Sequence, residues 1–330
     1  MMNPQPAEAP CSVLISVLNW NTAPLTLRCI ESLTQLASRS GLTTKIFVID
    51  NASEKNDYEV LRQSLDPTRV SLHREPANLG FTGGHNVAIK LAASKKMDFF
   101  WMVNSDTVVQ ADTLNKLLDM MAADGRCGIV SPVVMKMNTD EEIDFAGAFL
   151  DWAKLESIFP ATRAEYERLR DQMPERLWVA GTASLLRVAA LNKVGPLDDR
   201  LFAYFDDCDI SARMAAAGWV SRIQFDTKMS HVTSDNRKPY YYYLMQRNYL
   251  LFWHTQTPTP YHKFLYLKLV RQAFNRVNRL YRNGNDVQAD ARLLGIGDFI
   301  LGKYGAPHMD RRAPVWLKTL CRLTRILELP

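Results

Sequence analysis

The chain lacks the features that define several large classes of protein. It has five cysteines in 330 residues, an odd number without any Cys-x-x-Cys pair, so we expect neither a disulfide scaffold nor a structural zinc site, and a cytoplasmic localisation. Its longest uncharged apolar stretches, such as residues 99–103, fall well short of the roughly 20 residues that a membrane-spanning helix needs. Residues 1–11 carry neither the basic nor the apolar segment of a secretory signal. With only 15 glycines and 16 prolines, collagen-like and low-complexity chains are excluded.

Several catalytic signatures are missing as well. There is no Gly-x-x-x-x-Gly-Lys-Ser/Thr loop, which argues against a P-loop nucleotidase. No Gly-x-Gly-x-x-Gly follows the first apolar stretch, which argues against a dinucleotide-dependent dehydrogenase. The sequence has no Gly-x-Ser-x-Gly elbow of a serine hydrolase and no recognised nucleic-acid-binding module. We therefore expect no nucleic-acid partner.

Charge divides the chain into two parts. The net charge is +5, but residues 231–330 hold 16 Lys and Arg against 6 Asp and Glu, so the preceding residues are net acidic. A basic C-terminal part favours an anionic partner, such as a membrane surface or an anionic substrate. We expect a catalytic domain of residues 1–235 and a basic α-helical extension of residues 236–330.

The first two thirds of the chain alternates between strand and helix patterns. Short apolar, β-branched stretches predict strands at 12–18, 45–50, 70–73, 99–103, 128–134, 178–186 and 220–225. Apolar residues at helical spacing predict helices at 25–37, 86–93, 111–123, 163–170 and 188–194. This alternation indicates an α/β fold, a Rossmann-like, mostly parallel sheet flanked by helices. The last part predicts helices alone, at 240–253, 261–281, 286–303 and 316–327.

Three polar clusters stand where ligands bind in such folds, outside the carboxyl ends of the strands. Asp50 and Asn51 follow the second strand, residues 104–106 (NSD) follow the fourth, and the glycine-containing segment 78–84 leads into a helix. Their placement predicts one common site. Asn, Asp and Ser also cap helices and form turns, and this structural interpretation stays open for each cluster taken singly.

Several of these residues are typical of metal-assisted chemistry. Asp106, at the end of a strand, suits Mg²⁺ or Mn²⁺, which takes one or two protein carboxylates and completes its shell with phosphate oxygens. His231 is an imidazole ligand if it lies beside a metal, and otherwise structural. Three aspartates, Asp206, Asp207 and Asp209, open a helix, although one cap needs only one. Close like charges raise the pKa of at least one of them, which suits a general base.

An ordered series of motifs runs through residues 12–235. It consists of SVLNWN at 16–21, VIDNAS at 48–53, NLGF at 78–81, NSD at 104–106, GTA at 181–183, GPLD at 195–198, FAYFDDCDISAR at 202–213 and His231. The series resembles the inverting family 2 glycosyltransferases with the GT-A fold, and most of all their rhamnosyltransferase-like branch. The resemblance implies a GT-A type sheet with a C-terminal helical extension.

The resemblance also implies roles for individual residues. Asp50 would contact the nucleotide base. The other nucleotide-sugar residues would be Asn19, Asn51, Asn78, Gly80, Asn86, Asn104 and Ser105. Asp106 matches the metal-binding aspartate, His231 an additional metal ligand, and Asp207 the catalytic base. Asn104 replaces an aspartate of many relatives, as is common in the rhamnosyltransferase-like branch.

The implied reaction is transfer of a sugar from a nucleotide-diphosphate donor to a hydroxyl of a glycan or glycolipid acceptor. The resemblance favours dTDP-L-rhamnose as the donor and a role in bacterial cell-surface polysaccharide synthesis. Asp207 would remove the acceptor's proton, with inversion at the anomeric carbon and a divalent cation on the diphosphate. One alternative is a sugar nucleotidyltransferase, although the first strand is followed by Asn19-Trp20-Asn21-Thr22 instead of a glycine-rich basic motif. Another is a non-catalytic carbohydrate-binding or assembly subunit.

Residues 316–327 predict a basic amphipathic helix. Trp316, Leu317, Leu320 and Leu323 share one face, while basic residues lie elsewhere on the helix. Such a helix favours peripheral contact with the inner face of the cell membrane, where many bacterial lipid-linked acceptors reside. The alternative is that this face packs on the protein itself or on a second subunit of a homodimer.

Overall fold

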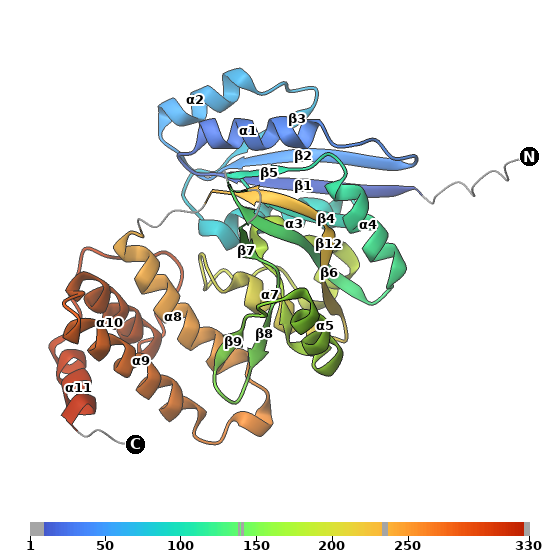
Figure 1. Ribbon diagram of the computed structural model, residues 1–330. Coiled ribbons are helices and arrows are strands. Elements are labelled where there is room, and N and C mark those ends of the chain that lie inside the picture. Colours follow the sequence, from blue (N-terminus) through green and yellow to red (C-terminus); the bar gives the residue numbers. More distant parts are fainter. Residues whose placement is uncertain (1–9, 138, 140–141, 233–236, 327–330) are drawn as a thin grey trace, which may run out of the picture.

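A computed structural model of the chain describes residues 10–137, 139, 142–232 and 237–326. Its centre is a sheet in which the strands follow the order β3-β2-β1-β4-β11-β6-β12-β5, with β7 paired to β6 (Figure 1). The strands are β1 (Cys11–Asn19), β2 (Leu42–Asp50), β3 (Val70–Arg74), β4 (Phe99–Asn104), β5 (Thr107–Val109), β6 (Cys127–Lys136), β7 (Ile143–Phe145), β11 (Leu185–Arg187) and β12 (Val220–His231). β1 pairs in parallel with β2 and β4, and β6 with β12, which confirms the mostly parallel α/β sheet.

Helices cover both faces of this sheet. They are α1 (Ala23–Thr34), α2 (Lys55–Ser64), α3 (Gly80–Ser94), α4 (Thr113–Ala123), α6 (Val188–Val194) and α7 (Asp206–Ala216). Because successive side chains of a strand point to opposite faces, β1 sends Val13, Ile15 and Val17 into a core with α1, α2 and α4, and Leu14 into a core with α3, α6 and α7. Both cores are apolar, so the sheet is buried on each side, as parallel sheets require.

A small antiparallel sheet stands beside the large one. It has the order β10-β8-β9, formed by β8 (Ala148–Asp151), β9 (Glu156–Ile158) and β10 (Leu177–Trp178), and α5 (Arg163–Gln172) precedes β10. The strand predicted over residues 178–186 is therefore wrong. The chain leaves the small sheet at Trp178, makes a 3-10 turn at Gly181–Ala183 and enters the large sheet as β11, between β4 and β6.

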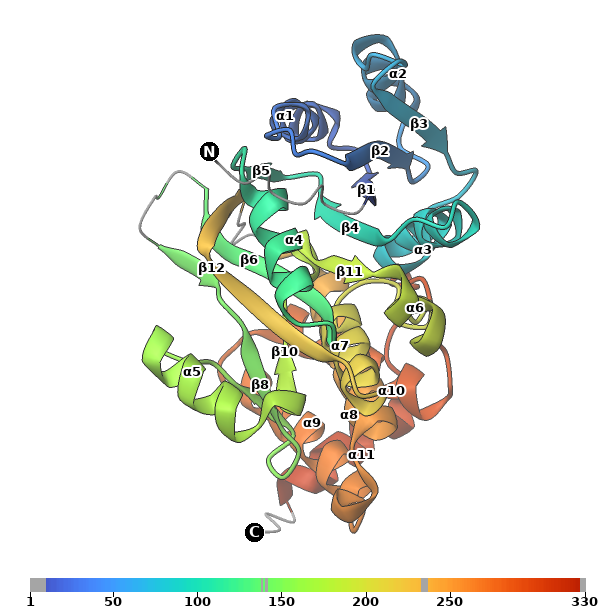
Figure 2. The ribbon, with the colours of Figure 1, turned by 90° about the vertical axis from the view of Figure 1, so that its right-hand side faces the viewer.

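The C-terminal part is helical, as predicted. It comprises α8 (Pro239–Gln256), α9 (Leu265–Arg282), α10 (Asp286–Ile300) and α11 (Val315–Ile326), with a short 3-10 turn at Thr259–Tyr261 between α8 and α9. Another 3-10 turn, at Pro174–Arg176, lies earlier in the chain, between α5 and β10. Figures 1 and 2 show these helices beside the small sheet and α7, away from β1–β3. Their core also takes in Leu150, Leu201 and Cys208 from the preceding part. The predicted boundary after residue 235 lies outside the described residues.

The last helix divides its apolar residues between the core and the surface. Leu317 and Cys321 are buried, and the Asn278 side chain of α9 donates a hydrogen bond to the Cys321 carbonyl at 3.0 Å. Trp316 and Leu323 remain 47% and 46% exposed. The helix thus packs on the protein through only one part of the predicted apolar face. No helix within the described ranges combines the length and apolar character needed to cross a membrane.

Candidate active site

The strand register brings the carboxyl ends of the central strands to one edge. Asn19 at the end of β1 lies opposite Asp50 at the end of β2, and Leu18 lies opposite Asn104 at the end of β4. His231 ends β12 opposite Thr107 of β5, so the short β5 holds the imidazole beside Asp106. The alignment of β1, β2 and β4 follows from parallel pairing, because parallel neighbours end on the same side of the sheet, whereas His231 is placed by the antiparallel pairing of β12 with β5.

An open cleft of about 640 Å³ lies at this edge. The sheet contributes Asn104, Asp106 and His231, and α7 contributes Asp207. The remaining lining includes Gly181 and Thr182 of the GTA motif, and Arg237, Lys238, Tyr240 and Tyr241. The cleft therefore brings together the two predicted metal ligands, the predicted base and one predicted donor-site residue.

Asp106 and His231 form the polar centre of the sheet side. His231 Nε2 lies 3.5 Å from Asp106 Oδ1, and His231 Nδ1 lies 3.2 Å from Asp144 Oδ2. Burial alone lowers the pKa of His231, but the two carboxylates outweigh it, and the net pKa is raised. Beside them, the Asn104 Oδ1 atom is buried and has no hydrogen-bond partner. Across the described residues no three His, Cys, Asp or Glu side chains form a complete metal cage.

Asp207 stands on the helical side of the cleft, in the first turn of α7. Its carboxylate accepts a hydrogen bond from the Cys208 backbone N–H at 2.8 Å. The neighbouring Asp206 is buried. Burial raises the pKa of both carboxyls, and the charge of Asp207 raises that of Asp206 further. The raised pKa of each carboxyl moves its titration toward the pH range in which a general base works.

The loop before α7 has a strained backbone. Phe202, Tyr204 and Phe205 all have positive φ, at 64°, 69° and 67°, a conformation that L-residues with side chains rarely adopt. Such strain persists only where the surrounding structure enforces it, and it clusters at functional sites. Here it directs the chain so that α7 begins at the cleft with its two aspartates.

Two buried residues of α8 hold this loop. The Asn248 Nδ2 atom lies 2.9, 2.7 and 3.0 Å from the carbonyl oxygens of residues 201, 203 and 204. The Arg247 guanidinium donates to the carbonyls of residues 200 and 201, each at 3.0 Å. The helical extension therefore fixes the shape of the loop that presents Asp207, a contribution that sequence motifs did not reveal.

The other predicted donor-site residues bond to one another beneath the cleft. Asn19 Nδ2 donates to Asp50 Oδ1 at 3.0 Å, and both residues are fully buried. Asn51 donates to the Asn78 side chain and to the Gly80 carbonyl, each at 3.0 Å. These bonds shape the loops that follow β2 and precede α3.

Asn86 and Ser105 also lie outside the cleft lining. The Asn86 side chain donates to the Leu197 carbonyl at 2.9 Å and to Asp199 at 2.6 Å, which ties α3 to the loop before α7. Ser105 Oγ lies 3.3 Å from the hydroxyl of Thr22, a residue that does line the cleft.

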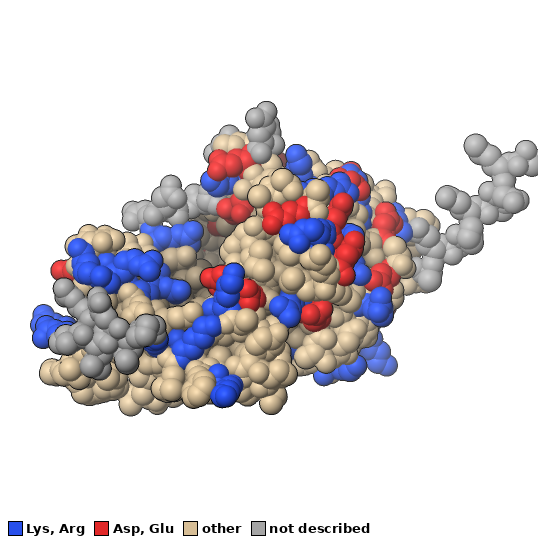
Figure 3. Space-filling view, turned by 60° about the horizontal axis from the view of Figure 1, so that its bottom comes forward, with Lys and Arg blue, Asp and Glu red and all other residues tan. Residues whose placement is uncertain are grey.

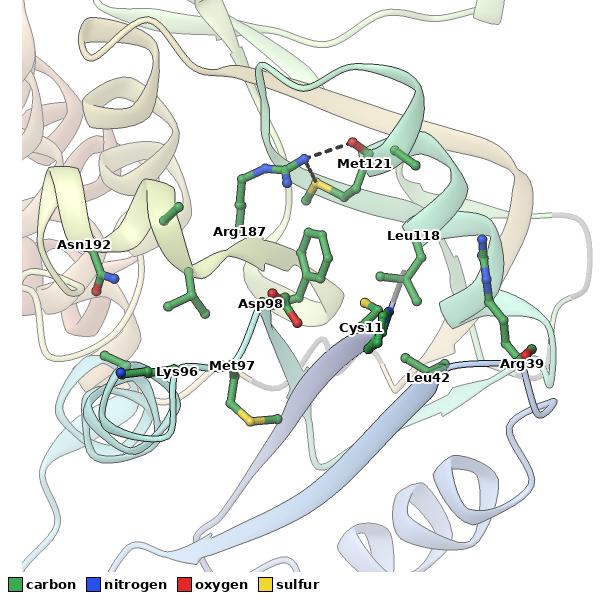
Figure 4. A pocket seen from close by; sticks show the side chains of 17 residues that line it. Cys11, Arg39, Leu42, Lys96, Met97, Asp98, Leu118, Met121, Arg187 and Asn192 are labelled. Atoms are coloured by element: carbon green, nitrogen blue, oxygen red, sulfur yellow. Dashed lines mark hydrogen bonds between the residues drawn. The ribbon is translucent and has the colours of Figure 1, made fainter. Parts of the chain in front are cut away.

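A larger cavity, of about 680 Å³, lies at the opposite edge of the sheet (Figure 4). Two of its charged groups, Asp98 and Arg187, are engaged within the chain. Asp98 accepts hydrogen bonds from the Ser12 backbone and hydroxyl, and Arg187 donates to the Met121 carbonyl at 2.9 Å and stacks on Phe99. This cavity lies away from the carboxyl ends of the strands, so the smaller cleft is the better candidate.

Comparison with known proteins identifies the class. The chain belongs to the glycosyl transferase family 2, whose model matches residues 12–195. A 60-residue segment is 37% identical to N-acetylglucosaminyl-diphospho-decaprenol L-rhamnosyltransferase of Mycobacterium tuberculosis, in strains CDC 1551 / Oshkosh and ATCC 25618 / H37Rv. That segment covers 18% of this chain and spans one fifth of the relative's length.

Solved structures confirm the GT-A fold. Staphylococcus aureus TarS 1-349 has a TM-score of 0.58 at 14% identity, over 96% of this chain and 87% of that one. The mannosyltransferase PcManGT from Pyrobaculum calidifontis, in complex with GDP-Man and Mn²⁺, has a TM-score of 0.55 at 17% identity, over 99% and 83%. Both likenesses span the helical extension as well as the sheet. The family and the fold favour a glycosyltransferase over a sugar nucleotidyltransferase.

Proposed function

We propose that this glycosyltransferase transfers a sugar from a nucleotide-diphosphate donor to an acceptor hydroxyl with inversion at the anomeric carbon and with the help of a divalent cation. The observation that carries the proposal is the cleft that places Asp106 and His231 on one side and Asp207 on the other. A donor diphosphate belongs beside the first two residues, and the acceptor hydroxyl beside the third.

The donor set on the sheet side fits Mg²⁺ or Mn²⁺. Asp106 supplies a carboxylate, His231 an imidazole, and Asn104 a buried amide oxygen that no protein donor occupies. Such cations take one or two protein carboxylates and complete their shell with phosphate oxygens and water. When bound, the cation neutralises charge on the leaving nucleoside diphosphate. Asp106 and His231 would hold the cation and in this way orient the diphosphate.

Asp207 is proposed as the base. Burial raises its pKa, so it binds a proton more strongly than an ordinary carboxylate does. As the acceptor oxygen forms its bond to the anomeric carbon, its proton passes to Asp207 and the bond to the diphosphate breaks on the opposite face. A positioned base contributes about 10²–10⁴ in rate.

The buried amides and Asp50 act on the donor through the loops that they shape. Asn19, Asp50, Asn51, Asn78, Gly80, Asn86 and Ser105 are proposed to define the donor side of the site. Asp50 has no exposed surface, so contact between its carboxylate and a base requires the loop after β2 to rearrange when donor binds.

The name of the mycobacterial relative supports dTDP-L-rhamnose as the donor and a lipid-linked glycan as the acceptor. That name describes an L-rhamnosyltransferase that acts on N-acetylglucosaminyl-diphospho-decaprenol. A role at the inner face of the cell membrane in cell-surface polysaccharide synthesis follows from that choice. The exposed Trp316, Leu320 and Leu323 of α11 offer a peripheral contact with that surface. The same side chains are the predicted surface of a homodimer.

The test is release of nucleoside diphosphate from a panel of dTDP-, UDP- and GDP-sugars, with Mg²⁺, with Mn²⁺ and with EDTA. We expect slow release from one donor, because water replaces the acceptor, and loss of release in EDTA. Release that is unaffected by EDTA contradicts the role of the cation. A panel in which no nucleotide binds and none is released contradicts the proposed function.

A further inference from the structure

A second cavity, of about 420 Å³, opens on the other side of Asp207. It shares Asp207 and Tyr204 with the donor cleft, so the proposed base stands between the two spaces. One wall comes from the small sheet, with Phe159 after β9 and Trp178 in β10. The other comes from the helical extension, with Tyr249 of α8 and Arg276 of α9. A molecule in this cavity reaches the base from the side opposite the donor.

The wall on the small sheet is aromatic and open to solvent. Phe159 is 63% exposed and packs edge-on against Trp178, with ring centroids 6.2 Å apart. The Trp178 ring is held by a hydrogen bond from its Nε1 atom to Ser157 Oγ at 3.1 Å and by contact with Phe145 at 4.7 Å. An aromatic surface at the rim of a cavity is typical of ligand-binding pockets, which are lined mainly by apolar and aromatic side chains.

The wall on the helices carries Arg276, and a second arginine, Arg292, lies near it outside the cavity lining. The guanidinium of Arg276 lies 4.9 Å from the centre of the Tyr249 ring, and that of Arg292 lies 5.5 Å from the centre of the Tyr242 ring. Tyr242 and Tyr249 are seven residues apart in α8 and therefore share a face of that helix. Within the described part of the chain, neither arginine forms an ion pair with a carboxylate.

The two arginines also disturb each other. Burial and the nearby charge of Arg276 lower the pKa of Arg292 to about 10, and the Arg292 Nε atom is buried without a hydrogen-bond acceptor. The acidic group beside them, Glu156, has its own partner, because its carboxylate lies 3.9 Å from Lys154 Nζ. Among the described residues, Arg276 therefore lines the cavity without a carboxylate partner, and a guanidinium binds a phosphate group through paired, charge-assisted hydrogen bonds. Figure 3 shows Lys and Arg gathered over the C-terminal helices.

We propose that this cavity is the acceptor site, in which the wall of Trp178 and Phe159 contacts the acceptor sugar and Arg276 binds a phosphate ester attached to it, with Arg292 adding positive charge nearby. The inference rests on the proposed function, and it names the acceptor as a phosphorylated saccharide. The phosphate is either the diphosphate of a lipid-linked sugar or a phosphodiester within a polymer.

Binding of defined probes to the full chain, measured by calorimetry, tests this site without requiring turnover. The probes are octyl N-acetylglucosaminide, its octyl diphosphate analogue and an octyl phosphodiester of the same sugar. We expect the wild type to bind a phosphorylated probe at least about tenfold more tightly than the neutral glycoside, and the tighter of the two phosphorylated probes identifies the source of the phosphate. R276Q is expected to remove most of that preference, since a charge-assisted contact is worth about tenfold or more.

The matched control is R279Q, because Arg279 is exposed on the same helix and lies outside the cavity lining. It should keep both the preference and the release of nucleoside diphosphate. W178L should weaken all three probes. Equal affinity for charged and neutral probes, or a change below twofold in R276Q, overturns the proposal. Loss of donor affinity in R276Q assigns the arginine to the donor instead and also overturns it. Failure of the wild type to release nucleotide from any donor counts against the proposed function alone.

Discussion

Replacement of Asn248 tests whether the helical extension positions the proposed base. In N248A the carbonyls of Ala203 and Tyr204 lose the side-chain donor that binds them, whereas the carbonyl of Leu201 keeps Arg247. Asn248 is fully buried, but its bonds to residues 203 and 204 are partly buried, so each lost bond costs toward the lower end of the range for a buried group. Each buried carbonyl without a partner costs about 1–3 kcal/mol. We therefore expect the free energy of unfolding to fall by about 2–4 kcal/mol.

The catalytic effect should exceed what the lost stability explains. The loop that contains the three left-handed residues loses the bonds to the carbonyls of Ala203 and Tyr204, and we expect the first turn of α7 to move with it. A displacement of about 1 Å at a reacting group costs on the order of 10²-fold in rate. We expect donor hydrolysis, measured well below the melting temperature, to fall by about that factor in kcat with little change in KM.

Two further variants test whether the effect comes from the hydrogen bonds that Asn248 donates. One keeps its volume, and the other measures the effect of replacing an asparagine on the surface. N248D keeps the shape but supplies no donor and places charge against three carbonyls, so it should be at least as harmful as N248A. N275A changes an exposed asparagine of α9 and should alter the unfolding free energy by less than about 0.5 kcal/mol. If N248D unfolds and turns over like the wild type, Asn248 does not hold the loop.

Three other changes probe the site and its support. D207N should lower donor hydrolysis by about 10²–10⁴ while donor affinity, measured by calorimetry, stays within twofold; equal hydrolysis excludes Asp207 as the base. Because the pKa values of Asp206 and Asp207 are raised in the folded state, the unfolding free energy of the wild type falls as the pH rises above about 4. D206N removes one of these ionisations, so its unfolding free energy should increase relative to that of the wild type as the pH rises above about 4. G80A should cost at least about 1–2 kcal/mol, since Gly80 has φ +73° and its Cβ would lie 2.4 Å from the Phe202 carbonyl oxygen; the control G125A has open space around it.

The sequence predicted those parts of the fold that depend on local pattern. The strands of the large sheet that are apolar throughout, such as Phe99–Asn104, were found with nearly correct bounds because burial on both faces leaves no polar residue within them. Helix α2 was missed because its ten residues are mostly charged or polar and only Leu61 is buried. The small strands β8 and β9 have three or four residues each, too few to show a period.

The candidate site was predictable to the extent that its residues end strands. The polar cluster at residues 104–106 was placed by the end of a predicted strand, whereas His231 reaches Asp106 through the antiparallel pairing of β12 with the short β5, which the sequence did not predict. The contacts of Asn248 and Arg276 depend on which face of a helix meets which loop, and no periodicity in the sequence contains that information. Asn51, Asn78 and Asn86 carried the right spacing for the site, but the structure uses their amides to brace loops.

The acidic and the basic part of the chain both contribute to the candidate site and its support. The acidic N-terminal part supplies Asp207, yet the loop that presents it is held by Arg247 and Asn248 of the basic part, and the cavity on the acceptor side has one wall from each. A sheet edge that gathers negative carboxylates cannot by itself attract a phosphorylated acceptor, because like charges repel. In the proposed acceptor site, Arg276 of the adjoining helices supplies the opposite charge from the wall of the cavity that Asp207 also lines. The basic extension would thus complement an acidic sheet edge that, among the residues described, has no arginine of its own to offer the phosphate on that wall.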